Sequence, residues 1–299
     1  MEGTFSRAVG SKKLFHETIG EVEKALAYFE RHREKFIDGV RTGFPDIDAM
    51  TLGLKPGVSV IGARPEDGLT DFALTVCDNL VTSKDYRVLY FTGNLRSRQV
   101  AKRLLSISSR VSLASLEGGV LVSERDFPKI TGASGRYGIS DDILNIVDGK
   151  IDEDIVCSET RRFVGQKNKR KPIVFLDRFQ DILPMNDESL YRPSRNIARE
   201  LTDLANDLDL TMIVLSEMKK VSKTKIPTCA DLRDFGAFEY DKLGMLLRKG
   251  DVCEQEELGQ EAFGMDCFFT NNPYDKSNEP VRLTYLLRCG RFESCAKID

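Results

Sequence analysis

A loop between an apolar run and a helix-like stretch has the setting of a phosphate-binding loop. The run Val58–Gly62 predicts a buried strand, and Asp71–Val76 predicts the start of a helix. Between them lies Ala63–Thr70, with the sequence ARPEDGLT. Phosphate-binding loops follow the pattern G-x-x-x-x-G-K-[ST], in which backbone N–H groups and a helix N-terminus surround the phosphates. The segment therefore predicts a fold that handles nucleotides.

The same loop lacks the residue on which the nucleotide chemistry depends. Gly68 and Thr70 fit the pattern. Leu69, however, stands where the lysine belongs, and Ala63 stands where the first glycine belongs. A leucine offers neither the charge nor the donor that reaches the β- and γ-phosphates, whereas a threonine hydroxyl can still hold Mg²⁺.

Of the carboxylates in and near the loop, two oppose nucleotide binding and one favours it. Glu66 and Asp67 lie within it, and each would face phosphate at a cost of at least ~1 kcal/mol even in water. In contrast, the apolar run Ile173–Leu176 ends in Asp177, the type of acid that holds Mg²⁺ through water in phosphate-loop enzymes. We expect nucleotide binding to be disfavoured, with a remnant of the magnesium site.

The composition is that of an ordinary globular protein. Of 299 residues, 41% are hydrophobic and 30% charged, and the net charge is −3, so any nucleic-acid contact must come from a local patch. No apolar stretch approaches the ~20 residues that span a bilayer. The seven cysteines form no C-x-x-C pair. We expect a reduced, cytoplasmic protein with no membrane segment and no metal centre.

Strand-like and helix-like segments alternate along the chain, which predicts an α/β fold with a mostly parallel central sheet flanked by helices. The expected strands are Val58–Ile61, Val88–Thr92, Ile173–Leu176, Thr211–Leu215, Cys267–Thr270 and Val281–Leu286. The expected helices are Asp71–Thr82, Ser97–Ser109, Asp152–Phe163 and Ser194–Leu208. The segments Gly43–Asp48 and Gly53–Gly57 are expected to be turns.

An amphipathic pattern precedes this core. We expect residues 1–13 to form a flexible tail, residues 14–38 a linker or docking helix, and residues 39–299 one domain. The apolar residues of the helix recur at spacings of three and four: Phe15, Ile19, Val22, Leu26 and Phe29. Such a helix either packs on its own domain or docks on a neighbouring subunit.

Seven segments follow one another in a recognisable series. They are Thr42–Thr51 with Gly53–Gly57, Ala63–Pro65 with Gly68, Gln99 with Arg103–Ser106, Leu176–Gln180, Ile213–Ser216, Asp231–Glu239, and Gly290–Glu293. In order and rough spacing they resemble the C-terminal domain of DnaB-type replicative helicases. The resemblance implies a RecA-like fold of the phosphate-loop NTPases, and a helix before it that packs against the next subunit of a ring.

The departures from the family pattern fall on catalytic positions. Besides Leu69, Asn94 stands where the family has the glutamate that activates water, and asparagine cannot accept a proton. Glu217 replaces the sensor glutamine, and Asn272 lies where a pair of cations would reach the neighbour's ATP. The positions that keep matching types in the implied nucleotide and Mg²⁺ site are Arg64, Gly68, Thr70, Asp177 and Gln180.

The resemblance also implies a DNA-contacting region. A basic cluster follows the fourth predicted strand and, in the family, faces the central channel: Lys219, Lys220, Lys223, Lys225 and Arg233. Flexible lysines there could follow the phosphates of single-stranded DNA without reading sequence. The alternative is an ordinary solvated basic loop.

Two hypotheses of function follow. The first is a DnaB-like protein without catalytic activity that binds a helicase, a helicase loader or DNA during replication, and that uses no cofactor. The alternative is a divergent but active ATP-dependent DNA helicase, using ATP and Mg²⁺, in which Arg64 or Lys242 replaces the lost charge. The chain could also form a ring of its own, or a mixed ring in which it completes the site of a catalytic partner.

Overall fold

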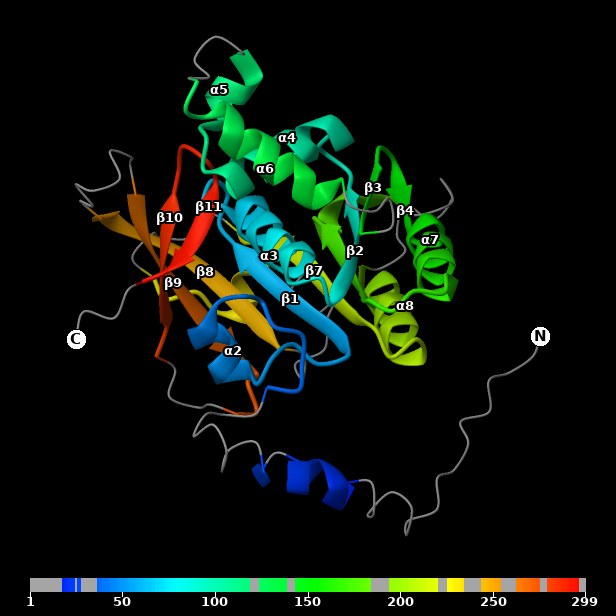
Figure 1. Cartoon of the computed structure of the whole chain (residues 1–299). Coiled ribbons are helices and arrows are strands. Elements are labelled where there is room, and N and C mark those ends of the chain that lie inside the picture. The colour runs from blue at the N-terminus through cyan, green and yellow to red at the C-terminus, as the bar shows by residue number, and fades with distance from the viewer. Residues whose placement is uncertain are drawn as a thin grey trace. The chain divides into compact units, whose positions relative to one another are not determined.

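The computed structural model describes residues 18–24, 26–27, 37–118, 124–138, 143–183, 194–219, 225–233, 243–253, 262–274 and 279–295. The chain divides into two compact units, Met1–Asp38 and Gly39–Asp299 (Figure 1). None of the described helices combines the length and the apolar character needed to cross a bilayer.

The described part of the first unit is a helix with a bare apolar stripe. Residues 18–24 and 26–27 are helical, and residues 37 and 38 are not. Ile19, Val22 and Leu26 are exposed at 55%, 54% and 57%. The predicted tail, Phe15 and Phe29 lie outside the described residues.

The second unit is built on one large sheet. Among the described residues, nine strands pair in the order β11-β10-β9-β8-β1-β7-β5-β2-β3. Their bounds are β1 Gly57–Ala63, β2 Tyr86–Thr92, β3 Leu144–Asp148, β5 Lys171–Asp177, β7 Thr211–Glu217, β8 Gly244–Cys253, β9 Ala262–Thr270, β10 Val281–Leu286 and β11 Arg291–Ser294. The six strands from β8 to β3 are parallel, and β8 to β11 pair antiparallel. The predicted mostly parallel α/β sheet is confirmed.

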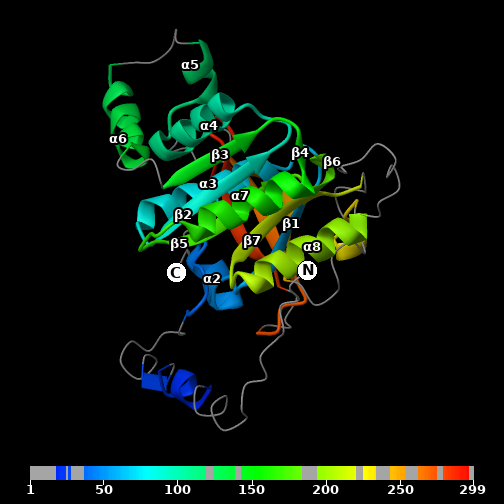
Figure 2. The same ribbon diagram turned by 90° about the vertical axis from the view of Figure 1, so that its right-hand side faces the viewer.

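Helices cover both faces of this sheet. On one face lie α3 (Leu69–Ser83), α4 (Ser97–Ser109), α5 (Leu113–Gly118) and α6 (Phe127–Tyr137), and on the other lie α7 (Glu153–Gly165) and α8 (Ser194–Asp207) (Figures 1 and 2). The four predicted helices are α3, α4, α7 and α8. A small parallel pair, β4 (Ile151–Asp152) with β6 (Ile182–Leu183), lies outside the main sheet.

The central strands are buried on both sides because their side chains alternate between two cores. In β7, Ile213 and Leu215 join the core under α3 and α4, whereas Met212 and Val214 join the core under α7 and α8. This two-sided burial explains why the strands read as continuous apolar runs.

The predicted turn at Gly43–Asp48 is wrong, because the chain forms the short helix α2 (Pro45–Thr51) there. Proline at the first helical position lacks only an N–H that would be unpaired anyway. Phe44 stacks on Phe72 with ring centroids 5.5 Å apart. The buried Asp48 carboxylate accepts from the backbone N–H and the hydroxyl of Thr42, each at 2.7 Å.

Candidate nucleotide site

The phosphate-type loop opens into a pocket at the carboxyl edge of the parallel strands. The loop joins β1 to α3, and β1, β5 and β7 end at the same edge because they are parallel. The pocket has a volume of about 220 Å³. Its lining comes from the loop, α3, α4, β10, the segments after β2 and β5, and the last residue of β7: Arg64, Pro65, Glu66, Gly68, Leu69, Thr70, Asp71, Asn94, Arg103, Arg178, Glu217 and Tyr285.

The loop takes a shape that requires glycine at one position. Gly68 precedes α3 with φ +81°, and a Cβ there would meet the rings of Phe292 at 3.0 Å and Tyr285 at 3.2 Å. Glu66 is exposed and lines the pocket, whereas Asp67 is buried and its carboxylate accepts from the backbone N–H of Lys249 at 3.5 Å. Of the two loop carboxylates, only Glu66 therefore lines the phosphate space.

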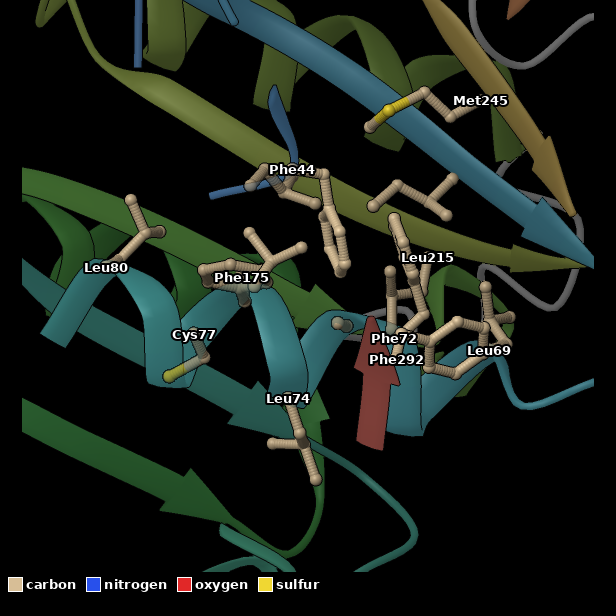
Figure 3. Packing of buried hydrophobic residues seen from close by; sticks show 14 of the residues in the cluster. Phe44, Leu69, Phe72, Leu74, Cys77, Leu80, Phe175, Leu215, Met245 and Phe292 are labelled. Carbon is tan, nitrogen blue, oxygen red and sulfur yellow. The ribbon is translucent and has the colours of Figure 1, made fainter. Parts of the chain in front are cut away.

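The lysine position serves packing in this chain. Leu69 is the first residue of α3, only 8% exposed, and belongs to the core cluster that includes Phe72 and Phe292. Figure 3 shows these three side chains gathered at one end of the cluster. The pocket remains open, but this position supplies it with an apolar wall and no charge.

Thr70 and Asp177, the pair expected to hold Mg²⁺, lie within hydrogen-bonding distance of each other. The hydroxyl of Thr70 donates to Asp177 Oδ1 at 3.2 Å, and the hydroxyl of Tyr90 donates to Oδ2 at 2.9 Å. Burial raises the pKa of Asp177 to about 6, although both hydroxyls and the nearby Arg178 favour its charged form. Tyr90, with no exposed surface, was not anticipated because its role depends on the pairing of β2 with β5.

Arg178, which was not among the predicted site residues, also lines the pocket. Arg178 follows β5 with φ +76°, and its guanidinium donates to Glu217 at 2.5 Å and to Asp181 at 3.1 Å. Arg233 approaches the other oxygen of Glu217 at 3.5 Å. The signal was present in the sequence, because Arg178 stands at the tyrosine of the family's I-D-Y-L-Q motif.

Two further arginines in the pocket are also held by groups of the chain. Arg103 pairs with Asp71 at 2.6 Å, and the other oxygen of Asp71 accepts from Tyr285 at 2.6 Å. Arg64 is buried and donates to the backbone carbonyl of Lys225 at 2.8 Å. These contacts tie α3, α4 and β10 together around the loop.

The remaining predicted site residues are divided between three places. Asn94 lines the pocket and also a second hollow of about 560 Å³, which Gln180 lines without reaching the first. Gln180 donates to Ser216 at 2.9 Å. Asn272 is buried away from this pocket, where its amide donates to the carbonyl of Met50 at 3.0 Å.

The described part of the predicted DNA cluster is largely engaged within the chain. Lys225 forms an ion pair with Asp231 at 2.7 Å, and Arg233 pairs with Glu217. Lys219 is exposed. Lys220 and Lys223 lie outside the described residues, as does Lys242.

The residues present fit half of an ATP–Mg²⁺ site. Thr70 and Asp177 form the pair that would hold the metal, and the N-terminus of α3 opens on the pocket. On the phosphate side, Leu69 supplies no charge, and Glu66 and Glu217 bring carboxylates to the lining. The magnesium side therefore fits its ligand, and the triphosphate side does not.

Comparison with known proteins places this geometry in one family. The family model described as the DnaB-like helicase C terminal domain matches residues 39–293. The replicative DNA helicase DnaB of Haemophilus influenzae is 27% identical over 294 residues, covering 95% of this chain and 60% of that protein. A probable plasmid replicative DNA helicase of Chlamydia muridarum is 28% identical over 228 residues, covering 75% of this chain and 49% of that protein. The chain thus spans about half to three fifths of these relatives.

Solved structures agree on the fold. One of them, described as an ATPase domain, superimposes with a TM-score of 0.81 at 24% identity, covering 97% of this chain and all of that one. A DnaB-like replicative helicase, described together with its interactions with primase, gives 0.78 at 24% identity, covering 98% of this chain and 69% of that one. The chain belongs to the DnaB-like helicase C-terminal domain family and has its RecA-like fold.

Proposed function

We propose that this chain is a DnaB-like helicase domain that no longer hydrolyses ATP efficiently and that acts in DNA replication by binding a replicative helicase, its loader or DNA. One observation carries the proposal: the three arginines that line the phosphate pocket are each held by a group of the chain itself. Arg103 is held by Asp71, Arg178 by Glu217, and Arg64 by a backbone carbonyl. A phosphate would have to share these guanidinium groups with the partners that the chain already provides.

The loss of the other catalytic groups supports the same proposal. Asn94 lines the pocket at the position of the water-activating glutamate and cannot take a proton. Asn272 is buried against Met50 at the position of the cations that would reach a neighbour's ATP, and the loss of such a finger is worth 10³–10⁵ in rate. Together these losses predict negligible turnover even if nucleotide binds.

A docking role is supported by the helix of the first unit. Ile19, Val22 and Leu26 form an exposed apolar stripe at spacings of three and four, the pattern of a helix that lies in a partner's groove. The names of the relatives, which are replicative helicases, point to a partner in replication. A ring of this chain alone, or a mixed ring with an active helicase, is compatible with this surface.

A second candidate is a divergent but active helicase. It is favoured by the Thr70–Asp177 pair and by the presence of Arg178 in the pocket, where a cation could replace the missing lysine. Of the substitutes suggested by sequence, Arg64 lines the pocket but is bound to Lys225.

The deciding experiment is ATP turnover by the unmodified chain, with and without single-stranded DNA, beside a purified active DnaB-type helicase. We expect turnover at the background rate in both conditions. DNA-stimulated turnover would contradict the proposal and favour the second candidate.

Docking needs a separate experiment, which is native mass spectrometry of the chain alone and mixed with the helicase. A chain that stays monomeric in both samples would remove the docking role from the proposal.

A further inference from the structure

A basic hollow lies at the edge of the sheet opposite the nucleotide pocket. It has a volume of about 670 Å³ and is lined by Lys84, Lys167, Asn168, Lys169 and Arg170. Lys84 directly follows α3 and precedes β2, and the other four residues precede β5. The turns before β2 and β5 therefore lie together in space, although Lys84 in one and Lys167 in the other are 83 residues apart in the sequence.

Charge in this hollow is concentrated and unbalanced. With Lys171, which is exposed at the start of β5, the two turns carry five cations against one acid, Asp85. Within the described ranges, these five cations take part in no ion pair shorter than 4.0 Å. Such a concentration contrasts with the net charge of −3 for the whole chain.

The hollow is held in shape by hydrogen bonds to backbone groups of its two turns. The guanidinium of Arg170 donates to the carbonyl of Lys84 at 3.1 Å, which ties the two turns together. Asn168 accepts from the backbone N–H of Arg170 at 2.9 Å, and the N–H of Lys171 donates to the carbonyl of Asp85 at 2.9 Å. These contacts fix the backbone of the two turns relative to each other, which lowers the entropy cost of bringing their cations to one polyanion.

We propose that this surface, the basic hollow, binds the phosphate backbone of single-stranded nucleic acid without reading its sequence. The lining contains cations and one amide but no apolar or aromatic side chain. An acidic protein partner would normally anchor itself through buried apolar or aromatic contacts, whereas phosphates need only positive charge. Without aromatic side chains, bases cannot stack, so the affinity is electrostatic and falls steeply with salt.

The choice of nucleic acid as the ligand rests on the proposed function in DNA replication. The test of this inference, however, depends neither on ATP turnover nor on docking to a helicase. The probe is a fluorescent oligothymidylate, titrated by anisotropy over a series of salt concentrations. The variant is Lys84→Asn/Lys167→Gln/Lys169→Gln, with asparagine at Lys84 because that residue has φ +66° and asparagine tolerates this conformation. The control removes three exposed cations elsewhere: Arg98→Gln/Lys102→Gln/Arg195→Gln.

We expect the hollow variant to bind the probe at least tenfold more weakly, and its slope of log K against log salt to be shallower by about 2, since each lost phosphate contact on a single strand removes about 0.7. The control should keep most of the affinity. Equal losses in both variants would reduce the effect to net charge and overturn the proposal. Unchanged binding of the probe by the hollow variant would also overturn the proposal. A chain that binds polyglutamate but not the oligothymidylate would overturn it too, and would identify an acidic protein as the partner.

Discussion

Arg178 and Glu217, which follow and end neighbouring strands β5 and β7, form an ion pair within the phosphate pocket. Glutamate at the sensor position and arginine after the strand aspartate are both departures from the family pattern, and they meet in space. The carboxylate of Glu217 forms an ion pair with the guanidinium of Arg178, the cation that a phosphate would otherwise contact. The pocket thus contains its own anion beside this cation, in addition to lacking the lysine.

The first prediction concerns this pair. Glu217→Gln removes a negative charge from the lining and breaks one of the two ion pairs of Arg178, leaving the one with Asp181. ADP and ATP should therefore bind about fivefold more tightly, equivalent to roughly 1 kcal/mol for a charge a few ångströms away in a water-exposed site. Isothermal titration with each nucleotide measures the change. Glu159→Gln, which breaks an exposed pair with Arg162 on α7, is the matched control. Equal affinity in both variants would show that the Arg178–Glu217 pair does not limit binding.

The second prediction concerns the lysine position. Leu69→Lys puts a charged side chain where a leucine is 8% exposed against the core, so the free energy of unfolding should fall by about 1–3 kcal/mol. Nucleotide affinity should rise, because an ammonium can reach the phosphates. Turnover should stay at background, since Asn94 cannot act as a base. Urea unfolding, nucleotide titration and phosphate release separate the three effects, with Leu69→Met as the uncharged control. A Leu69→Lys variant that hydrolyses ATP would show that the other losses are compensated.

The third prediction concerns pH. Burial raises the pKa of Asp177 to about 6, well above the value of about 4 in an unfolded chain. The folded state therefore favours the protonated acid, and the stability that this group contributes is present below pH ~4 and lost as pH rises to ~6. Asp177→Asn removes this dependence, so at pH 7.5 it should be more stable than the unmodified chain by about 1–3 kcal/mol.

Urea unfolding of both chains at pH 4 and pH 7.5 measures this difference. The exposed Asp207→Asn provides the control, because it removes one carboxylate without touching the core. If Asp177→Asn were less stable at pH 7.5, the hydroxyls of Tyr90 and Thr70 would be stabilising the carboxylate more than burial destabilises it.

The fourth prediction concerns the helix of the first unit. Leu26→Asp interrupts the exposed apolar stripe and should abolish association with a helicase ring, or with further copies of the chain, while leaving the melting temperature of the chain unchanged. Lys24→Asp changes the same helix at an exposed polar residue and should keep the association. Native mass spectrometry measures the oligomeric state of each variant, alone and mixed with the helicase. A loss of association in both variants would point to charge, and no loss in either would remove the stripe from the interface.

Local patterns in the sequence were enough to predict most of the strands and helices around the central sheet. The continuous apolar runs of β1, β5 and β7 identify strands that are buried on both faces. The helices α3, α4, α7 and α8 follow from periodicity. In contrast, β8 was missed, because its apolar run Met245–Leu247 is short and followed by Arg248 and Lys249. Its strand conformation depends on pairing with β1 and β9, which are distant in the chain. Propensity carries no information about such partners.

The sequence by itself determined the family, the position of the phosphate loop and the absence of a lysine from it, because these depend on residue types and spacing along one segment. Only the tertiary structure decided which charged and hydrogen-bonding groups meet: Arg178 with Glu217, Asp71 with Tyr285, and Lys225 with Asp231. The first two of these pairs join segments brought to one edge of the sheet by its strand order. Coulomb energy depends on distance in space, so the charge of the pocket follows from the folded arrangement of strand ends.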